Sequence, residues 1–178
     1  MLVVTKFLRR LRHTPIAHLK VVALLGLSVA LLVTNLLISW PVHAENYEKR
    51  TLSNSDFSGQ DLVGSEFDLA NLQGSNFSGA DMRGVNLFGA KVQGSNFEGT
   101  NLSFATMDKA RFNRTNLKNA ILEGAFAYNA DFSGADIEGA DFTDALLRND
   151  MLEKLCAVAK GTNPVTGRDT RETLYCDY

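Results

Sequence analysis

A strict five-residue repeat of large apolar residues constrains the fold of this chain more than any other feature. Neither an α-helix, with a period of 3.6 residues, nor an ordinary β-strand, with a period of 2, places apolar residues at every fifth position. The pattern therefore predicts stacked units, because one unit alone cannot bury its apolar side. Ala127 breaks the rule. The apolar residues, called centres below, are Leu52, Phe57, Leu62, Phe67, Leu72, Phe77, Met82, Leu87, Val92, Phe97, Leu102, Met107, Phe112, Leu117, Leu122, Phe132, Ile137, Phe142 and Leu147.

The positions around each centre also repeat. From Phe57 onward the residue two positions before the centre is small except at Gln60 and Val85, and the residue one before is usually Asp or Asn. The residue two positions after the centre is often Gly, which suits a corner where the backbone needs a positive φ. We expect the centre and the small residue to point inward, because a narrow interior leaves room for only one large side chain in each pentad.

This unit resembles that of the pentapeptide-repeat family, Ala-(Asp/Asn)-Leu-X-X, over residues 52–148. The resemblance implies an all-β solenoid, namely a right-handed quadrilateral (four-sided) parallel β-helix of about five coils, with four pentads to a coil. Its first to fourth sides are numbered here from the centres Phe57, Leu62, Phe67 and Leu72. Residues twenty apart would stack, which predicts two internal ladders of aromatic rings. They are Phe57, Phe77 and Phe97, and Phe112 and Phe132.

Residues 1–44 predict an N-terminal hydrophobic helix for export or anchoring. A basic leader without acidic residues precedes an uncharged run from Val21 to Trp40. The residues before Ala44–Glu45 fit a signal-peptidase site. An uncleaved anchor is the alternative, because about 20 apolar residues can span a bilayer, and Arg9-Arg10 leaves twin-arginine export open. In each case the basic leader would stay on the cytoplasmic side and the acidic repeat domain would lie on the opposite side of the membrane. Residues 45–51 would form a linker or N-terminal cap.

The period fails after Leu147, and residues 149–178 predict a C-terminal cap with a short helix. We expect the helix to run from Met151 to about Ala159, with Asp150 as its N-cap. In an oxidising compartment Cys156 and Cys176 predict a disulfide, although free thiols or a redox switch stay open. Residues 155–176 resemble the cap of thylakoid-lumen pentapeptide-repeat proteins of oxygenic phototrophs, which implies such a disulfide and a lumenal location.

The third side departs most from the repeat. Phe88 stands at an outward position, Phe104 stands at a corner, and Phe126 and Tyr128 flank the small centre Ala127. One interpretation is a local slip in which Phe126 enters the core, or a patch that the chain itself covers. The other is that Phe88, Phe104, Phe126 and Tyr128 form an exposed patch for a protein partner.

The sequence predicts no catalytic, cofactor or metal residues. All three histidines precede Ala44, which excludes histidine-dependent catalysis in the exported domain. Asp61 and Asp81 are twenty residues apart and would stack on the second side. Such a pair is compatible with a retaining glycosidase or a weak calcium site, or it would simply raise the pKa of one carboxyl group.

These features favour a non-enzymatic interaction scaffold with an unknown protein partner in the thylakoid lumen or periplasm. Residues 45–178 hold 13 basic and 20 acidic residues, so their net charge of −7 argues against binding nucleic acid through phosphates. Two alternatives are a DNA mimic that binds topoisomerase, as some pentapeptide-repeat proteins do, and a carboxylate-dependent enzyme that acts on polysaccharide. The sequence leaves the oligomeric state open, and membrane contact is expected only through the N-terminal segment.

Overall fold

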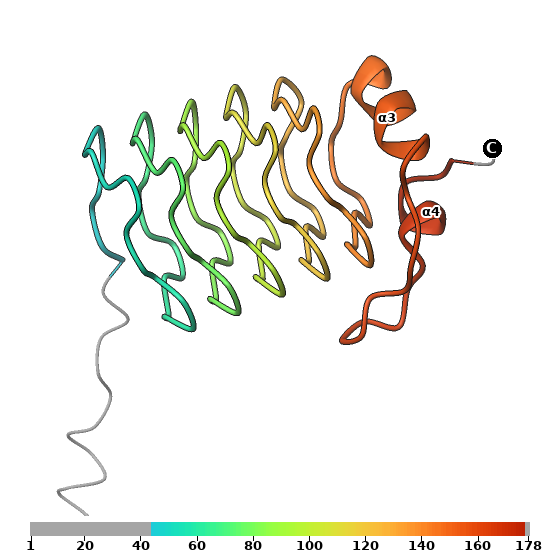
Figure 1. Cartoon of the computed structure of the whole chain (residues 1–178), viewed down its shortest axis with the longest axis horizontal. Coiled ribbons are helices and arrows are strands. Elements are labelled where there is room, and N and C mark those ends of the chain that lie inside the picture. Colours follow the sequence, from blue (N-terminus) through green and yellow to red (C-terminus); the bar gives the residue numbers. More distant parts are fainter. Residues whose placement is uncertain (1–43, 177–178) are drawn as a thin grey trace, which may run out of the picture. The chain divides into compact units, whose positions relative to one another are not determined.

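The computed structural model describes residues 44–176, which form a stack of four-sided coils closed at the C-terminal end by a helical cap (Figure 1). Each coil pairs with the next through parallel β-bridges between residues twenty apart, from Asn46–Glu66 to Phe126–Leu146. The bridges align in four columns, one on each side of the coil. The predicted coil of four pentads is therefore present. The hydrophobic run Val21–Trp40 lies outside the described residues, among which no helix is long and apolar enough to cross a membrane.

Each side of a coil contributes only one bridging residue, so the sides are isolated bridges and not extended strands. A tight turn follows every centre from Leu52 to Phe142, as where the N–H of Ala70 donates to the carbonyl of Phe67 at 3.0 Å. The residue before the end of this turn has a positive φ, 65° at Gly79 for example, except at Asn129 in the irregular pentad. This is the geometry of a type II turn, which favours glycine. The turn occupies most of the pentad and leaves one residue to form a bridge with the adjacent coil.

Where Asp or Asn precedes a centre, it completes the hydrogen bonding of the turn. Its side-chain oxygen accepts the N–H of the residue after the centre, as in Asn86 with Phe88 (3.0 Å) and Asp131 with Ser133 (3.0 Å). Bridges and turns already use the other N–H groups of most pentads. The recurrent Asp and Asn residues are thus explained by a local backbone requirement. We call the position before the centre the Asx position.

The interior contains both predicted aromatic ladders. The rings of Phe57, Phe77 and Phe97 stack with centroid distances of 5.0 and 4.8 Å. The rings of Phe112 and Phe132 stack at 5.2 Å. The solenoid begins earlier than predicted, inside the segment 45–51 that we expected to be a linker or cap. There the ring of Tyr47 stacks on Phe67 at 4.6 Å, and Asn46 forms the first bridge.

The cap contains helix α3 (Asn149–Cys156) and the short helix α4 (Thr170–Thr173). The N-cap of α3 is Arg148, without a side-chain hydrogen bond, so the prediction of Asp150 as N-cap was wrong. Asp150 lies within the first turn, where Arg148 pairs with it. Met151 and Leu155 of α3 are buried in the apolar core together with Leu174, so the cap extends that core beyond the last coil.

One buried side chain, Asn163, fastens the cap to the last coils. Its Nδ2 lies 2.9 Å from the carbonyl oxygen of Gly139, 3.1 Å from that of Asn119 and 3.3 Å from that of Ala120. Its Oδ1 accepts the N–H groups of Val165 and Thr166. The side chain therefore holds its own loop and binds the solenoid at the same time.

A second fastening is ionic. The guanidinium of Arg168 lies 2.5 Å from Glu123 Oε2 and 2.7 Å from Asp141 Oδ2. Asp141 is fully buried. Burial raises the pKa of Asp141, but hydrogen bonds from Thr143 and the charge of Arg168 outweigh this, and the pKa lies below its ordinary value.

Candidate interaction surface on the third side

The structure keeps the third side in register through its irregular pentad. Phe126 forms bridges to Thr106 and Leu146, and its N–H donates to the carbonyl of Ala105 at 2.9 Å. The side chain of Ala127 is the inward one, with 1% exposure. The interpretation of a slip that takes Phe126 into the core was therefore wrong, because the backbone ladder fixes which side chain points inward.

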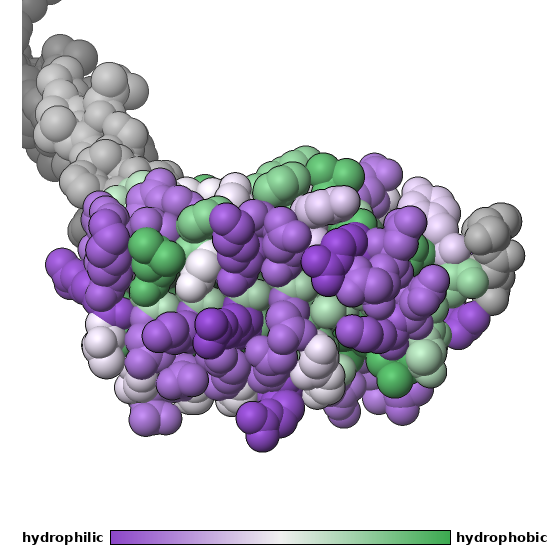
Figure 2. Space-filling view, turned by 90° about the horizontal axis from the view of Figure 1, so that it is seen from above, coloured by the Kyte–Doolittle hydropathy of each residue, from purple (hydrophilic) through white to green (hydrophobic). Residues whose placement is uncertain are grey.

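The third-side patch, defined as Phe104, Phe126, Tyr128 and Leu146, is exposed. The exposed fractions of its four side chains are 68%, 43%, 49% and 57% in that order. Phe126 and Leu146 are bridge partners, so their side chains are neighbours on adjacent coils. Figure 2 shows hydrophobic residues as separate patches among mainly hydrophilic ones on one face of the body. Grouped exposed apolar side chains are typical of contact sites.

Phe104 is held over the neighbouring corner. A Cβ atom built on Gly124 would lie 2.8 Å from two ring carbons of Phe104, so only glycine leaves room for the ring there. Phe104 itself has a φ of 59°, which is rare for a bulky residue. Thr106, two residues after Phe104, is the bridge partner of Phe126. The strained corner therefore presents the Phe104 ring close to Phe126 on the adjacent coil.

Phe88 differs from the other predicted patch residues. It is half-buried, and the ammonium group of Lys109 lies 5.2 Å from the centre of its ring. This cation–π contact covers part of the ring face. The structure therefore brings Phe104, Phe126 and Tyr128 to an exposed surface, and it adds Leu146, which the sequence analysis missed. The available signal was an apolar residue at the Asx position, twenty residues after Phe126.

The patch replaces a stabilising element of the repeat. At the Asx positions of the third side, Asn86 accepts a backbone N–H, whereas Phe126 and Leu146 have no side-chain acceptor. A hydrogen bond of this kind contributes about 0.5–1.5 kcal/mol to stability. Phe126 and Leu146 also expose apolar surface to water. Neither the lost acceptor nor the exposed apolar surface stabilises the isolated fold, which favours a role for these residues in contact with another molecule.

The stacked carboxylates of the second side serve the fold. Asp61 and Asp81 are bridge partners, and each accepts the N–H of the residue two positions later. Hydrogen bonds from Arg83 lower the pKa of Asp81 despite partial burial. No group of three or more His, Cys, Asp or Glu residues suited to a metal ion occurs within residues 44–176.

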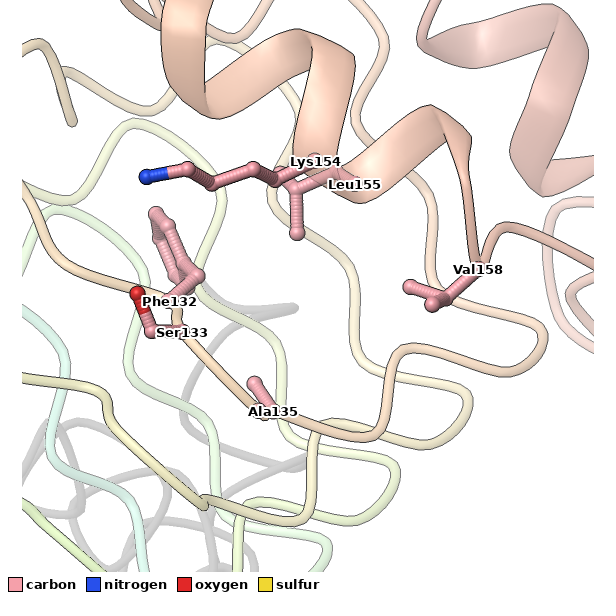
Figure 3. Close-up of a pocket in the computed structure, with 7 residues that line it drawn as sticks. Phe132, Ser133, Ala135, Lys154, Leu155 and Val158 are labelled. Carbon is pink, nitrogen blue, oxygen red and sulfur yellow. The ribbon is translucent and has the colours of Figure 1, made fainter.

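The cap contains a cleft and the expected disulfide. Cys156, the last residue of α3, is bonded to Cys176. A cleft of about 220 Å³ lies between residues 132–135 of the last coil and α3. In Figure 3 the side chain of Lys154 extends along this cleft beside Phe132 and Ser133. The cleft has an apolar wall and one ammonium group, but no arrangement of catalytic groups.

The repeat geometry matches that of a known family. The profile described as pentapeptide repeats matches eight copies, over residues 52–87, 83–119 and 110–149. The chain belongs to the pentapeptide-repeat family. Solved proteins of this family imply that the four-sided coil is a right-handed quadrilateral β-helix.

Among pentapeptide-repeat proteins, similar ones come from thylakoid lumens. The crystal structure of one from the Arabidopsis thaliana thylakoid lumen is 42% identical with a TM-score of 0.73, and covers 74% of this chain and 91% of that chain. Thylakoid lumenal 15 kDa protein 1, chloroplastic, of Arabidopsis thaliana is 54% identical over 37 residues, which span 21% of this chain and 16% of that protein. HetL, a pentapeptide repeat protein involved in heterocyst differentiation regulation from the cyanobacterium Nostoc, is 22% identical with a TM-score of 0.29, and covers 55% of this chain and 49% of that chain.

Proposed function

We propose that this pentapeptide-repeat protein is an exported, non-enzymatic scaffold that docks a protein partner through the third-side patch. The proposal depends on one observation, the grouped exposure of Phe126, Tyr128 and Leu146 on adjacent coils of the third side. Two of these residues occupy Asx positions, where most pentads use Asp or Asn to satisfy the backbone. Aromatic residues are enriched where proteins contact one another.

The thylakoid lumen or a periplasm is the compartment that we propose. The similar Arabidopsis thaliana protein comes from a thylakoid lumen, and the basic leader with the apolar run Val21–Trp40 is typical of an export signal or anchor. The bond between Cys156 and Cys176 also suits an oxidising compartment. Fractionation of the native cells tests this, and recovery of the protein in the cytosol would contradict it. N-terminal sequencing of the same material reports whether Ala44–Glu45 is cleaved.

The docking role is tested by affinity capture from the native membrane and lumen fraction. The test variant combines F104G, F126N and Y128S. Glycine fits the positive φ at Phe104, and asparagine restores the side-chain acceptor of the repeat at Phe126, so the fold is expected to persist. V165S is the matched control, because Val165 is a strongly exposed apolar residue in the cap.

We expect the wild-type chain and V165S to retain the same partner, and the triple variant to lose it. Circular dichroism of all three chains checks that they are equally folded. If the folded triple variant captures the same set of proteins as the wild type, the third-side patch is not a docking surface.

A further inference from the structure

The fourth side carries three of the cations that form no ion pair within residues 44–176. Within residues 44–176, ion pairs are formed by Lys49, Arg83, Lys118, Arg148, Lys160 and Arg168. Lys91, Arg111 and Arg114 are exposed, and in this described part they form no ion pair within 4.0 Å. All three lie on the fourth side, on two adjacent coils, although residues 45–178 have a net charge of −7.

The repeat geometry places the three cations close together. Lys91 and Arg111 are bridge partners, which places their backbones about 4.8 Å apart. Arg114 stands at the corner of the same pentad as Arg111, with a φ of 58°. The carboxylate of Asp131, the next residue in the column, accepts hydrogen bonds from Asn113 and Ser133 and does not pair with Arg111. Like charges opposite one another on paired strands destabilise the fold.

Lys91 and Arg111 also occupy Asx positions. The chain therefore has a repulsive pair of cations where Asp or Asn would accept a backbone N–H, and neither cation forms an ion pair with Asp131, the next residue in the column. Arrangements that weaken the isolated fold without an internal gain are expected at functional sites. An external anion would remove the repulsion.

The surroundings of these cations are polar. On the fourth side the amide of Gln73 donates to the amide oxygen of Gln93 at 3.2 Å, and Asn113 directly precedes Arg114 in the sequence. The outward residues of 51–54, 71–74, 91–94, 111–114 and 131–134 include no large apolar side chain. A lipid surface would thus be held by charge alone, without an inserted side chain. Guanidinium groups instead match carboxylates through paired hydrogen bonds, and amides add further donors and acceptors.

We infer that the fourth side is a second docking surface, formed around Lys91, Arg111 and Arg114, for an acidic protein segment. This surface differs from the third-side patch in position and chemistry, so either can fail independently. An extended acidic segment with a carboxylate at every second residue presents its charges on one face, about 7 Å apart. The long side chains of Lys91 and Arg111 can reach such carboxylates from adjacent coils.

The test uses the full chain in non-ionic detergent and a fluorescent peptide of alternating Glu and Ser, at about 50 mM salt to limit screening. The test variant is K91Q/R111Q/R114Q. The matched control, R83Q/K118Q/K160Q, removes the same number of positive charges from cations that already have carboxylate partners. Both variants retain the basic leader, so its contribution cancels. A peptide of alternating Gln and Ser measures binding without charge.

We expect K91Q/R111Q/R114Q to weaken binding of the acidic peptide at least about tenfold, equivalent to about 1.4 kcal/mol. The control should change it by less than about threefold, and F126N should leave it unchanged. Equal losses in both triple variants, or no binding of the acidic peptide by the wild type, would overturn the inference. So would stronger retention on vesicles of phosphatidylglycerol and phosphatidylcholine, if that retention depends on the same three residues.

Discussion

Replacing Asn163 with alanine tests how the cap is attached to the solenoid. The change removes three short contacts from Nδ2 to the carbonyls of Asn119, Ala120 and Gly139, and two hydrogen bonds accepted by Oδ1. The side chain is fully buried, so water does not replace these partners. A buried polar group left without a partner costs about 1–3 kcal/mol. With partial relaxation of the loop, we expect N163A to lower the free energy of unfolding by about 3 kcal/mol.

The assay is urea and thermal unfolding of the full chain in non-ionic detergent, followed by circular dichroism. A loss of about 3 kcal/mol corresponds to a fall of roughly 10 °C in the midpoint for a chain of this size. The matched control is N149A, because Asn149 is exposed at the start of α3 and its substitution should change stability by less than about 0.5 kcal/mol. Hydrogen exchange of the cap amides shows whether the cap opens before the coils, since solenoid units unfold separately.

A second variant separates the donor role of Asn163 from its volume. N163D keeps the size and the acceptor oxygen but aims a carboxylate at three carbonyl oxygens. We expect it to be at least as destabilising as N163A near neutral pH and to recover partly in acid, where a protonated carboxyl group donates. Values for N163A within about 0.5 kcal/mol of N149A would refute the assigned fastening.

Two further predictions concern the same end of the molecule. Because the pKa of Asp141 is lowered in the fold, its charge contributes stability above the unfolded-state pKa, and that contribution disappears as the pH falls through the folded-state value. D141N should therefore lose less stability than the wild type between about pH 5 and about pH 2, and parallel unfolding curves would contradict this. Reduction of the bond between Cys156 and Cys176 should lower the free energy of unfolding by about 3 kcal/mol, whereas dithiothreitol should not change a C156S/C176S chain.

The repeat made much of the fold predictable, because the period of five fixes both the inward residues and their partners twenty positions away. The stacked rings of Phe57, Phe77 and Phe97 followed from that spacing. The start of the solenoid was missed because Glu45 stands where the repeat has a small residue. In the structure the N–H of Glu45 donates to the hydroxyl of Ser65, and the backbone continues the ladder without a small side chain.

The cap was less predictable because its contacts join residues far apart in sequence. In the sequence, Asn163 is typical of a turn residue before a proline. No neighbouring residue indicates that its side-chain amide contacts the carbonyl of Asn119, 44 residues away. The start of α3 also depends on contacts between distant residues. In the regular ladder the N–H of Asn129 would donate to the carbonyl of Arg148, but that carbonyl accepts the N–H groups of Met151 and Leu152 in α3. The N–H of Asn129 donates instead to the side chain of Asp108.

The candidate surfaces share one signal, which is a side chain at the Asx position that cannot accept the backbone N–H as Asp or Asn does. Phe126 and Leu146 show it on the third side, and Lys91 and Arg111 show it on the fourth, while Ile121 is a single such residue on the second side. If these residues served only the fold, replacing them with Asn should weaken it. If they serve docking, the same replacements restore a hydrogen bond worth about 0.5–1.5 kcal/mol and abolish binding. Stability and binding should thus change in opposite directions for F126N and for K91N/R111N, a combination that a purely structural role does not produce.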